Sequence, residues 1–142
     1  MNNEPKIALM SIRPKYAQLI VEGQKTFEFR RLCISSDVVA ILIYATAPVR
    51  RLVGIASVGT IVEAAPSRLW RLIGSNGGIS RRELLSYFHG RKKGFAISLR
   101  AVRRFPKPLS PGKYLKGFRP PQSFQYFELS KISRHLTDLR SE

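Results

Sequence analysis

Three residues near the N-terminus combine side chains that bind phosphate with a side chain that moves protons. Lys25, Glu28 and Arg30 lie in the stretch GQKTFEFRR, residues 23–31. Lysine and arginine stabilise phosphate charge, and a carboxylate serves as a general base or as an ion-pair partner. Two interpretations are open: a solvent-facing Glu28–Arg30 ion pair worth under about 1 kcal/mol, or a cleft lined by Lys25, Glu28 and Arg30.

The alternation of this stretch predicts which side chains lie together. Successive side chains of a strand point to opposite faces. Lys25 would then share a face with Phe27 and Phe29, and Glu28 would share the other face with Arg30. A lysine that acts as nucleophile or base must be neutral, which requires burial or nearby cations. Because Glu28 opposes that change, we expect a charged Lys25 that holds a phosphate or a base edge.

Further candidates lie at the ends of predicted strands. Ser11 and Arg13 end the first strand, where they either cap the following helix or contact a ligand. Tyr44 and Thr46 lie at the exit of the central strand. Tyr44 either stacks on a base, a contact worth about 1–3 kcal/mol, or packs in the core.

The stretch RPPQS, residues 119–123, is less easily explained by packing. Two prolines make a rigid loop that holds Arg119, Gln122 and Ser123 in place. Glutamine reads base edges and arginine holds phosphates. We therefore expect these three side chains to contact nucleic acid.

The composition of the chain gives little support for a metal site or a cofactor site. The chain has one cysteine and two histidines, and acidic residues are sparse. We expect His89 and His135 to be surface residues, and we expect no metal site and no cofactor. The single Cys33 excludes an intrachain disulfide and agrees with a cytoplasmic location.

The charge of the chain favours a polyanionic partner. Twenty-five Lys and Arg against nine Asp and Glu give a net charge of +16 over 142 residues. Pairs of basic residues recur along the whole chain, which indicates a charged folded surface. Nucleic acid, either RNA or DNA, is the expected partner. We expect no membrane contact, because no apolar run is long enough to span one; the sequence does not define an oligomeric state.

Strand and helix patterns position these candidates within one expected domain, residues 1–142. A helix is expected from Arg13–Pro14 to Gly23, and two short helices are expected to begin at Ser67 and at Ser80, where Ser80 and Glu83 form a capping box. Residues 106–122 are expected to form a loop, and residues 130–142 a helix or tail with Ile132, Leu136 and Leu139 inside. Strands are expected over residues 6–12, 25–31, 38–46, 51–64, 94–105 and 123–129.

The glycines at 54 and 59 predict bulges or bends in the long strand. Such distortions curve a sheet. The pattern as a whole predicts an α+β fold, most simply a small curved β-barrel with short helices between the strands.

The pattern G-x-K-x-x-E-x-R, following SIRPKYAQLIVEG, resembles the signature of the ASCH domain family (activating signal cointegrator homology). The stretches IYATAPVRRLVGIASVG and RPPQSFQYF resemble a bacterial and phage branch of this family, and the resemblance covers residues 6–127. It implies a PUA-like fold and RNA held in a cleft lined by the signature residues. It also implies two enzymatic alternatives: a ribonuclease, or a hydrolase of a modified nucleoside such as N4-acetylcytidine.

The nucleoside hydrolase pattern matches only in part. That branch of the family uses a signature lysine, a threonine three residues later and a glutamate on a later strand. Lys25 matches the lysine and Glu63 matches the glutamate, but Glu28 stands where the threonine would be. The first expectation is therefore RNA binding in a basic cleft, with Lys25, Glu28 and Glu63 as the catalytic residues if the protein is an enzyme.

Overall fold

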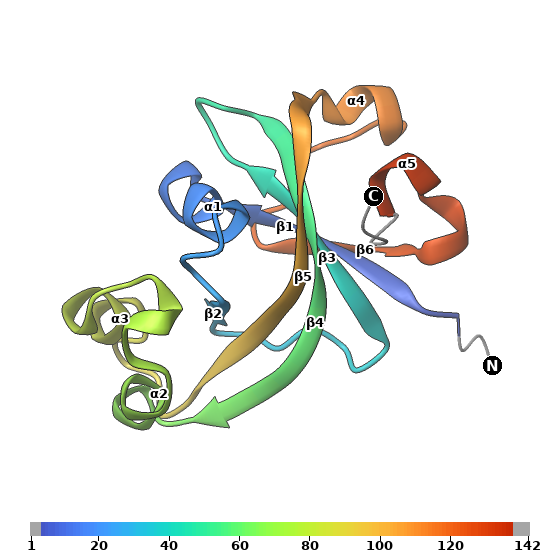
Figure 1. The fold of residues 1–142 in the computed structure, drawn as a ribbon. Helices are drawn as coiled ribbons and strands as arrows, with labels where there is room; N and C mark the ends of the chain where they lie inside the picture. Colours follow the sequence, from blue (N-terminus) through green and yellow to red (C-terminus); the bar gives the residue numbers. More distant parts are fainter. Residues whose placement is uncertain (1–3, 138–142) are drawn as a thin grey trace.

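Six strands form one mixed sheet in the order β2-β5-β4-β3-β1-β6 in the computed structural model, which describes residues 4–137 (Figure 1). The strands are β1 (Lys6–Ile12), β2 (Phe27–Arg30), β3 (Val38–Ala45), β4 (Arg51–Ala64), β5 (Gly94–Leu109) and β6 (Phe124–Glu128). The helices are α1 (Pro14–Val21), α2 (Pro66–Ile73), η1 (Gly74–Gly77), α3 (Arg81–Tyr87), α4 (Pro111–Tyr114), η2 (Leu129–Lys131) and α5 (Arg134–Thr137).

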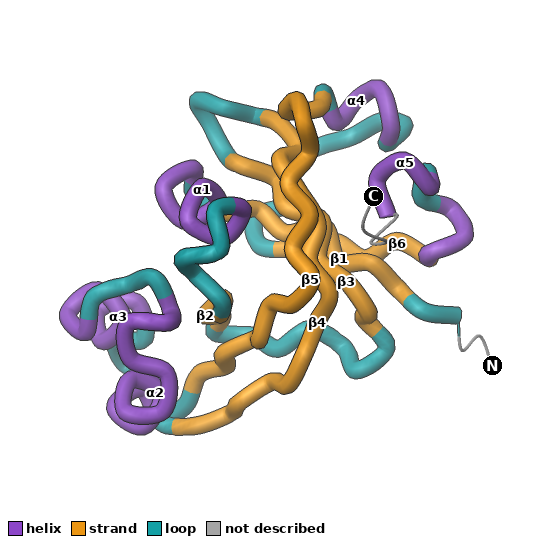
Figure 2. Tube along the Cα trace, viewed as in Figure 1, coloured by secondary structure: helices purple, strands orange, loops and turns teal. Residues whose placement is uncertain are grey.

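β1 and β3 pair in parallel, and the other neighbouring strands pair antiparallel. The register shifts between Leu52 and Gly54 and between Val58 and Ile61, next to the glycines that the sequence indicates as bulges. These irregularities bend the long β4–β5 ribbon, as the tube in Figure 2 shows. The expected curvature and the α+β class are thus confirmed.

The expected closure of the sheet into a barrel is not observed. β2 has only four residues and pairs with β5 alone, and β6 pairs with β1 alone, so the sheet ends at these two strands in the described part of the chain. Backbone hydrogen bonds therefore do not close the ring. The gap between β2 and the β1–β6 pair is where the candidate site lies.

Three apolar clusters fix the positions of the helices. One face of β1 and β3 packs on α1 through Met10, Ile43 and Ile20. The other face packs on the C-terminal helices through Leu42, Leu115 and Leu136. A third cluster packs α2 and α3 against β2 and β5. The helices are short, and burial of these apolar faces stabilises them more than intrinsic propensity does.

Several boundaries differ from the sequence expectation. The N-cap of α2 is Ala65 and Pro66 begins the helix, so Ser67 lies inside the first turn. The capping box of Ser80 and Glu83 is present as predicted. β5 continues to Leu109 and α4 follows it, so much of the segment expected as a loop is ordered secondary structure. Proline at the first turn begins both α2 and α4, because its φ angle is already helical.

The C-terminal helix α5 begins at Arg134, later in the chain than expected. Ile132 and Leu136 are buried as predicted, whereas Leu139 lies outside the described residues. Among residues 4–137, no helix has both the length and the apolar character to cross a membrane.

Candidate functional site

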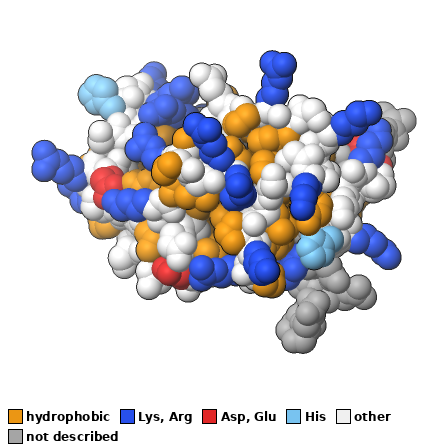
Figure 3. Space-filling model, turned by 90° about the horizontal axis from the view of Figure 1, so that it is seen from above, with side chains coloured by type: hydrophobic (Ala, Val, Ile, Leu, Met, Phe, Trp, Pro, Cys, Tyr) orange, Lys and Arg blue, Asp and Glu red, His pale blue; other side chains and the backbone are white. Residues whose placement is uncertain are grey.

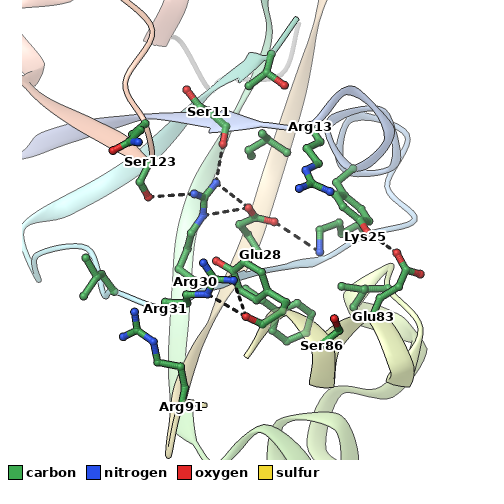
Figure 4. Close-up of a pocket in the computed structure, with 18 of the residues that line it drawn as sticks. Ser11, Arg13, Lys25, Glu28, Arg30, Arg31, Glu83, Ser86, Arg91 and Ser123 are labelled. Atoms are coloured by element: carbon green, nitrogen blue, oxygen red, sulfur yellow. Dashed lines mark hydrogen bonds and ion pairs between the residues drawn. The ribbon is translucent and has the colours of Figure 1, made fainter. Parts of the chain in front are cut away.

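Three charged side chains are buried together where β2 begins. Lys25, Glu28 and Arg30 expose only 2%, 7% and 9% of their surface. Glu28 lies between the two cations: its Oε1 is 3.6 Å from Lys25 Nζ, and its Oε2 is 2.9 Å from Arg30 Nη2 (Figure 4). Buried charges are stable only when they are paired. The interpretation as a solvent-facing ion pair is therefore wrong.

Lys25 reaches Glu28 although strand alternation predicts opposite faces. The reason is that β2 begins at Phe27, so Lys25 precedes the strand. Its backbone N–H donates to Leu19 O in the turn after α1, which sets its direction independently of the strand. Lys25 Nζ also lies 4.9 Å from the centre of the Phe29 ring, on the face that alternation does predict.

Arg30 links this network to two other segments. Its Nη2 donates to Ser11 O at 2.8 Å and its Nη1 donates to Ser123 Oγ at 3.1 Å. Ser11 Oγ in turn donates to Pro121 O at 2.7 Å. The signature stretch and the proline-containing loop thus meet at one site. Arg30 bridges the gap in the sheet with its side chain, and its Nε also donates to Glu28 Oε2.

The Lys25 ammonium group is enclosed rather than free. It donates to Gly77 O and lies 5.5 Å from the centre of the Tyr16 ring. Burial lowers the pKa of Lys25 below its ordinary value, and the neighbouring Glu28 carboxylate opposes that change without cancelling it. The expectation that Glu28 opposes the shift is correct, but desolvation is the larger influence. The pKa of Lys25 is thereby moved toward the range useful in acid–base chemistry.

Tyr16 and Glu83 connect α1 to α3 across the cleft. Tyr16 OH donates to Glu83 Oε2 at 2.5 Å. Burial and this bond raise the pKa of Tyr16 to about 12, and the same bond, with that from Ser80, lowers the pKa of Glu83 to about 2. The bond needs a protonated Tyr16 and an ionised Glu83. Its contribution to stability is present between pH 4.5 and 10, and is lost below as Glu83 is protonated and above as Tyr16 ionises.

A cleft of about 980 Å³ opens above this network. Six cations and two carboxylates line it, which makes it strongly positive. The cations at its rim, Arg13, Arg82 and Arg91, are exposed and take part in no ion pair within residues 4–137. Arg31 differs: it donates twice to Tyr87 O and lies 4.3 Å above the centre of the Tyr87 ring.

Most of the predicted site residues line this cleft. They are Ser11, Arg13, Lys25, Glu28, Arg30, Thr46, Gln122 and Ser123. Three others do not. Tyr44 is 3% exposed and packs on Phe118 on the opposite face of the sheet. Glu63 is exposed and pairs with Lys93. Arg119 is exposed and is not among the residues that line the cleft.

Sequence reasoning missed the contribution of α1 and α3. Tyr16 has the helical spacing of a core residue, and Glu83 is explained fully by the capping box, so neither pattern indicates a site. Arg82, Tyr87 and Arg91 are also in the cleft lining. The combination of arginines on both sides of a Tyr-Phe pair around α3 is the signal that could have indicated them. Within the described residues, no cluster of His, Cys, Asp and Glu suited to a metal ion is present.

The tight packing of Lys25 against Gly78 gives a testable prediction. Gly78 has a φ of +64°, and a Cβ there would lie 2.6 Å from Lys25 Cβ. Gly78→Ala is expected to destabilise the protein by about 1–3 kcal/mol in urea unfolding. Gly117→Ala is the matched control, because Gly117 has nearly the same φ, +66°, but a Cβ there would meet nothing within 4 Å. Equal losses in both variants would show that Lys25 is not held as described.

Comparison with known proteins identifies the family of this chain. The family model of the ASCH domain matches residues 10–87, which span β1 to α3. This chain belongs to the ASCH domain family. The "ASCH domain-containing ribonuclease" of Zymomonas mobilis is 34% identical over 140 residues, which cover 96% of this chain and 94% of that protein.

Two crystal structures of the Zymomonas mobilis ASCH protein have the same fold. One, titled "ASCH from Zymomonas mobilis", has a TM-score of 0.81 at 30% identity and covers 92% of each chain. The other, a serine-to-alanine variant, has a TM-score of 0.82 at 31% identity and covers 97% of this chain and 99% of that one. The open, mixed sheet described above fits the PUA-like fold that the family resemblance implies.

Proposed function

We propose that this ASCH protein binds RNA in the cleft between α1, α3 and the 119–123 loop. The observation that carries the proposal is the set of rim arginines, Arg13, Arg82 and Arg91, which lie around one cavity without an acidic partner in the described chain. Such side chains bind phosphate groups and release counterions on doing so. Ser11, Thr46, Gln122 and Ser123 add hydrogen-bonding groups at the opposite wall.

The cleft also has an apolar side that suits a nucleobase. Phe29, Ile79 and Leu32 line it, and the Arg31 guanidinium carbon lies 4.3 Å from the centre of the Tyr87 ring. Bases stack on aromatic rings and on arginine planes in single-stranded RNA complexes. Phosphates would lie at the rim arginines and a base near Arg31.

The direct test neutralises the rim. The triple variant R13Q/R82Q/R91Q is expected to bind an RNA of about 4 nucleotides at least about tenfold more weakly than wild type, with a salt slope lower by about 2. Fluorescence anisotropy over a salt series measures both. The matched control R68Q/R71Q/K92Q removes the same charge from exposed residues outside the cleft lining. Equal affinities of the two triple variants would overturn the proposal.

The second candidate function is ribonuclease activity at the same cleft. It is favoured by the relative named a ribonuclease, which matches nearly the full length of this chain, and by a buried lysine with a lowered pKa. In such a reaction the RNA 2′-oxygen attacks phosphorus, the P–O5′ bond breaks, and a 2′,3′-cyclic phosphate and a 5′-hydroxyl form. A base takes the 2′ proton and an acid protonates the leaving 5′ oxygen.

Lys25 is the group that we assign to proton transfer in this reaction, and Glu28 is the group that positions it. The exposed arginines would stabilise the charge on the phosphate oxygens. Glu63, expected from the sequence as a catalytic residue, has no part here because it lies outside the cleft lining. For the same reason, and because Glu28 replaces the threonine, hydrolysis of N4-acetylcytidine is not proposed.

A further inference from the structure

A second group of basic side chains lies outside the cleft, around one end of the β4–β5 ladder. Residues 84–127 contain ten Lys and Arg and no Asp or Glu. Viewed from above, the molecule presents many Lys and Arg side chains across this face, with Asp and Glu visible only toward its left and right ends (Figure 3). The concentration of one sign of charge makes this face a candidate surface for a polyanion.

Strand pairing brings two cations of this stretch, Arg104 and Lys107, to the same end of the sheet as Arg50 and Arg51. Arg50 and Arg51 follow the β3–β4 turn, and Arg51 pairs with Ala45. On the neighbouring strand, Arg104 pairs with Gly54 and Leu109 with Leu52, so Lys107 lies between them. Arg50, Arg51, Arg104 and Lys107, here termed the ladder-end patch, are all exposed and are absent from the cleft lining.

The described structure offers these cations no carboxylate. The ion pairs within residues 4–137 use other lysines and arginines. Arg51 donates only to the neighbouring Arg50 O. Four like charges at one end of a ladder repel one another, and a bound polyanion removes that repulsion. Planar guanidinium groups and a lysine also suit phosphate in particular.

The ladder-end patch continues from the cleft through a short turn. Thr46 lines the cleft, and its carbonyl accepts hydrogen bonds from the N–H groups of Val49 and Arg50. A strand that leaves the cleft past Thr46 therefore meets Arg50 and Arg51 first. We infer that the ladder-end patch is a second binding site, for the phosphodiester backbone of RNA too long for the cleft to hold. The identity of the strand as RNA rests on the proposed function.

RNAs of different length distinguish binding at the ladder-end patch from binding in the cleft. The quadruple variant R50Q/R51Q/R104Q/K107Q is expected to bind an RNA of about 20 nucleotides at least about tenfold more weakly than wild type, with a salt slope lower by about 3. Its affinity for an RNA of about 4 nucleotides is expected to stay within about twofold, because the cleft is intact. Anisotropy titrations at several salt concentrations measure both effects.

The matched control for this experiment is R68Q/R71Q/R81Q/K92Q, which removes the same charge from exposed residues elsewhere. Equal weakening by the two quadruple variants on the long RNA would overturn the inference in favour of general charge attraction, and so would an unchanged affinity of the ladder-end variant. Neither result tests the proposal that the cleft binds RNA. That proposal would be contradicted if the rim triple variant bound the short RNA as tightly as wild type.

Discussion

The Glu28→Ala variant is expected to lose about 3–5 kcal/mol of unfolding free energy. Glu28 is the only carboxylate that contacts both Lys25 and Arg30 in the described structure, and both cations are almost fully buried. Its removal leaves two desolvated positive charges next to each other. Equilibrium unfolding in urea, followed by far-UV circular dichroism, measures the loss.

Glu63→Ala provides the matched comparison for this prediction. Glu63 also forms an ion pair, with Lys93, but both partners are exposed. That variant is expected to lose less than about 1 kcal/mol. A Glu28→Ala protein as stable as Glu63→Ala would show that the three buried charges do not form the network described here.

The Lys25→Met variant is expected to cleave RNA at least about 100-fold more slowly than wild type, if the ribonuclease proposal holds. Methionine keeps the apolar stem of the side chain near Phe29 but cannot transfer a proton. Glu28 keeps its two contacts with Arg30, so the stability loss is expected to be smaller than in Glu28→Ala. Single-turnover cleavage of an end-labelled RNA measures the rate.

The pH dependence of the rate gives the same prediction a second readout. Burial lowers the pKa of Lys25, so its neutral form accumulates at a lower pH than that of a free lysine. If neutral Lys25 is the base, the wild-type rate rises with pH and levels off below the ordinary lysine pKa of 10.5. Lys25→Arg is expected to cleave no RNA across this pH range, because a guanidinium does not deprotonate in proteins. Cleavage by Lys25→Met at the wild-type rate would remove Lys25 from the chemistry, whereas intact RNA after incubation with the wild-type protein would leave RNA binding as the function.

The sequence predicted the elements of the sheet well, because their patterns are local. The apolar run that became β3 and the capping box of α3 are both explained by neighbouring residues alone. Motif resemblance predicted that Lys25, Glu28 and Arg30 line a cleft, and the proline-containing loop predicted that Ser123 contacts nucleic acid. Their meeting through an arginine that bridges an unclosed sheet needed coordinates.

The errors have three different causes. Alternation shows that Tyr44 and its neighbour Ile43 face opposite sides of β3, but it does not show which side holds the cleft. Ile43 packs toward α1, and Tyr44 packs toward Phe118. Glu63 was assigned by resemblance to a branch of the family whose threonine this chain lacks. The length of β2, which decides whether the sheet closes, also depends on tertiary packing rather than on local sequence.

The most direct test of the cleft as the RNA site is a chemical-shift titration of the ¹⁵N-labelled protein with an RNA of about 4 nucleotides. The account predicts that the largest amide shifts fall on both walls at once, at Ser11, Thr46 and Ser123 on one side and at Arg82 and Tyr87 on the other. Shifts confined to residues outside the cleft lining, or an unchanged spectrum at saturating RNA, would contradict it.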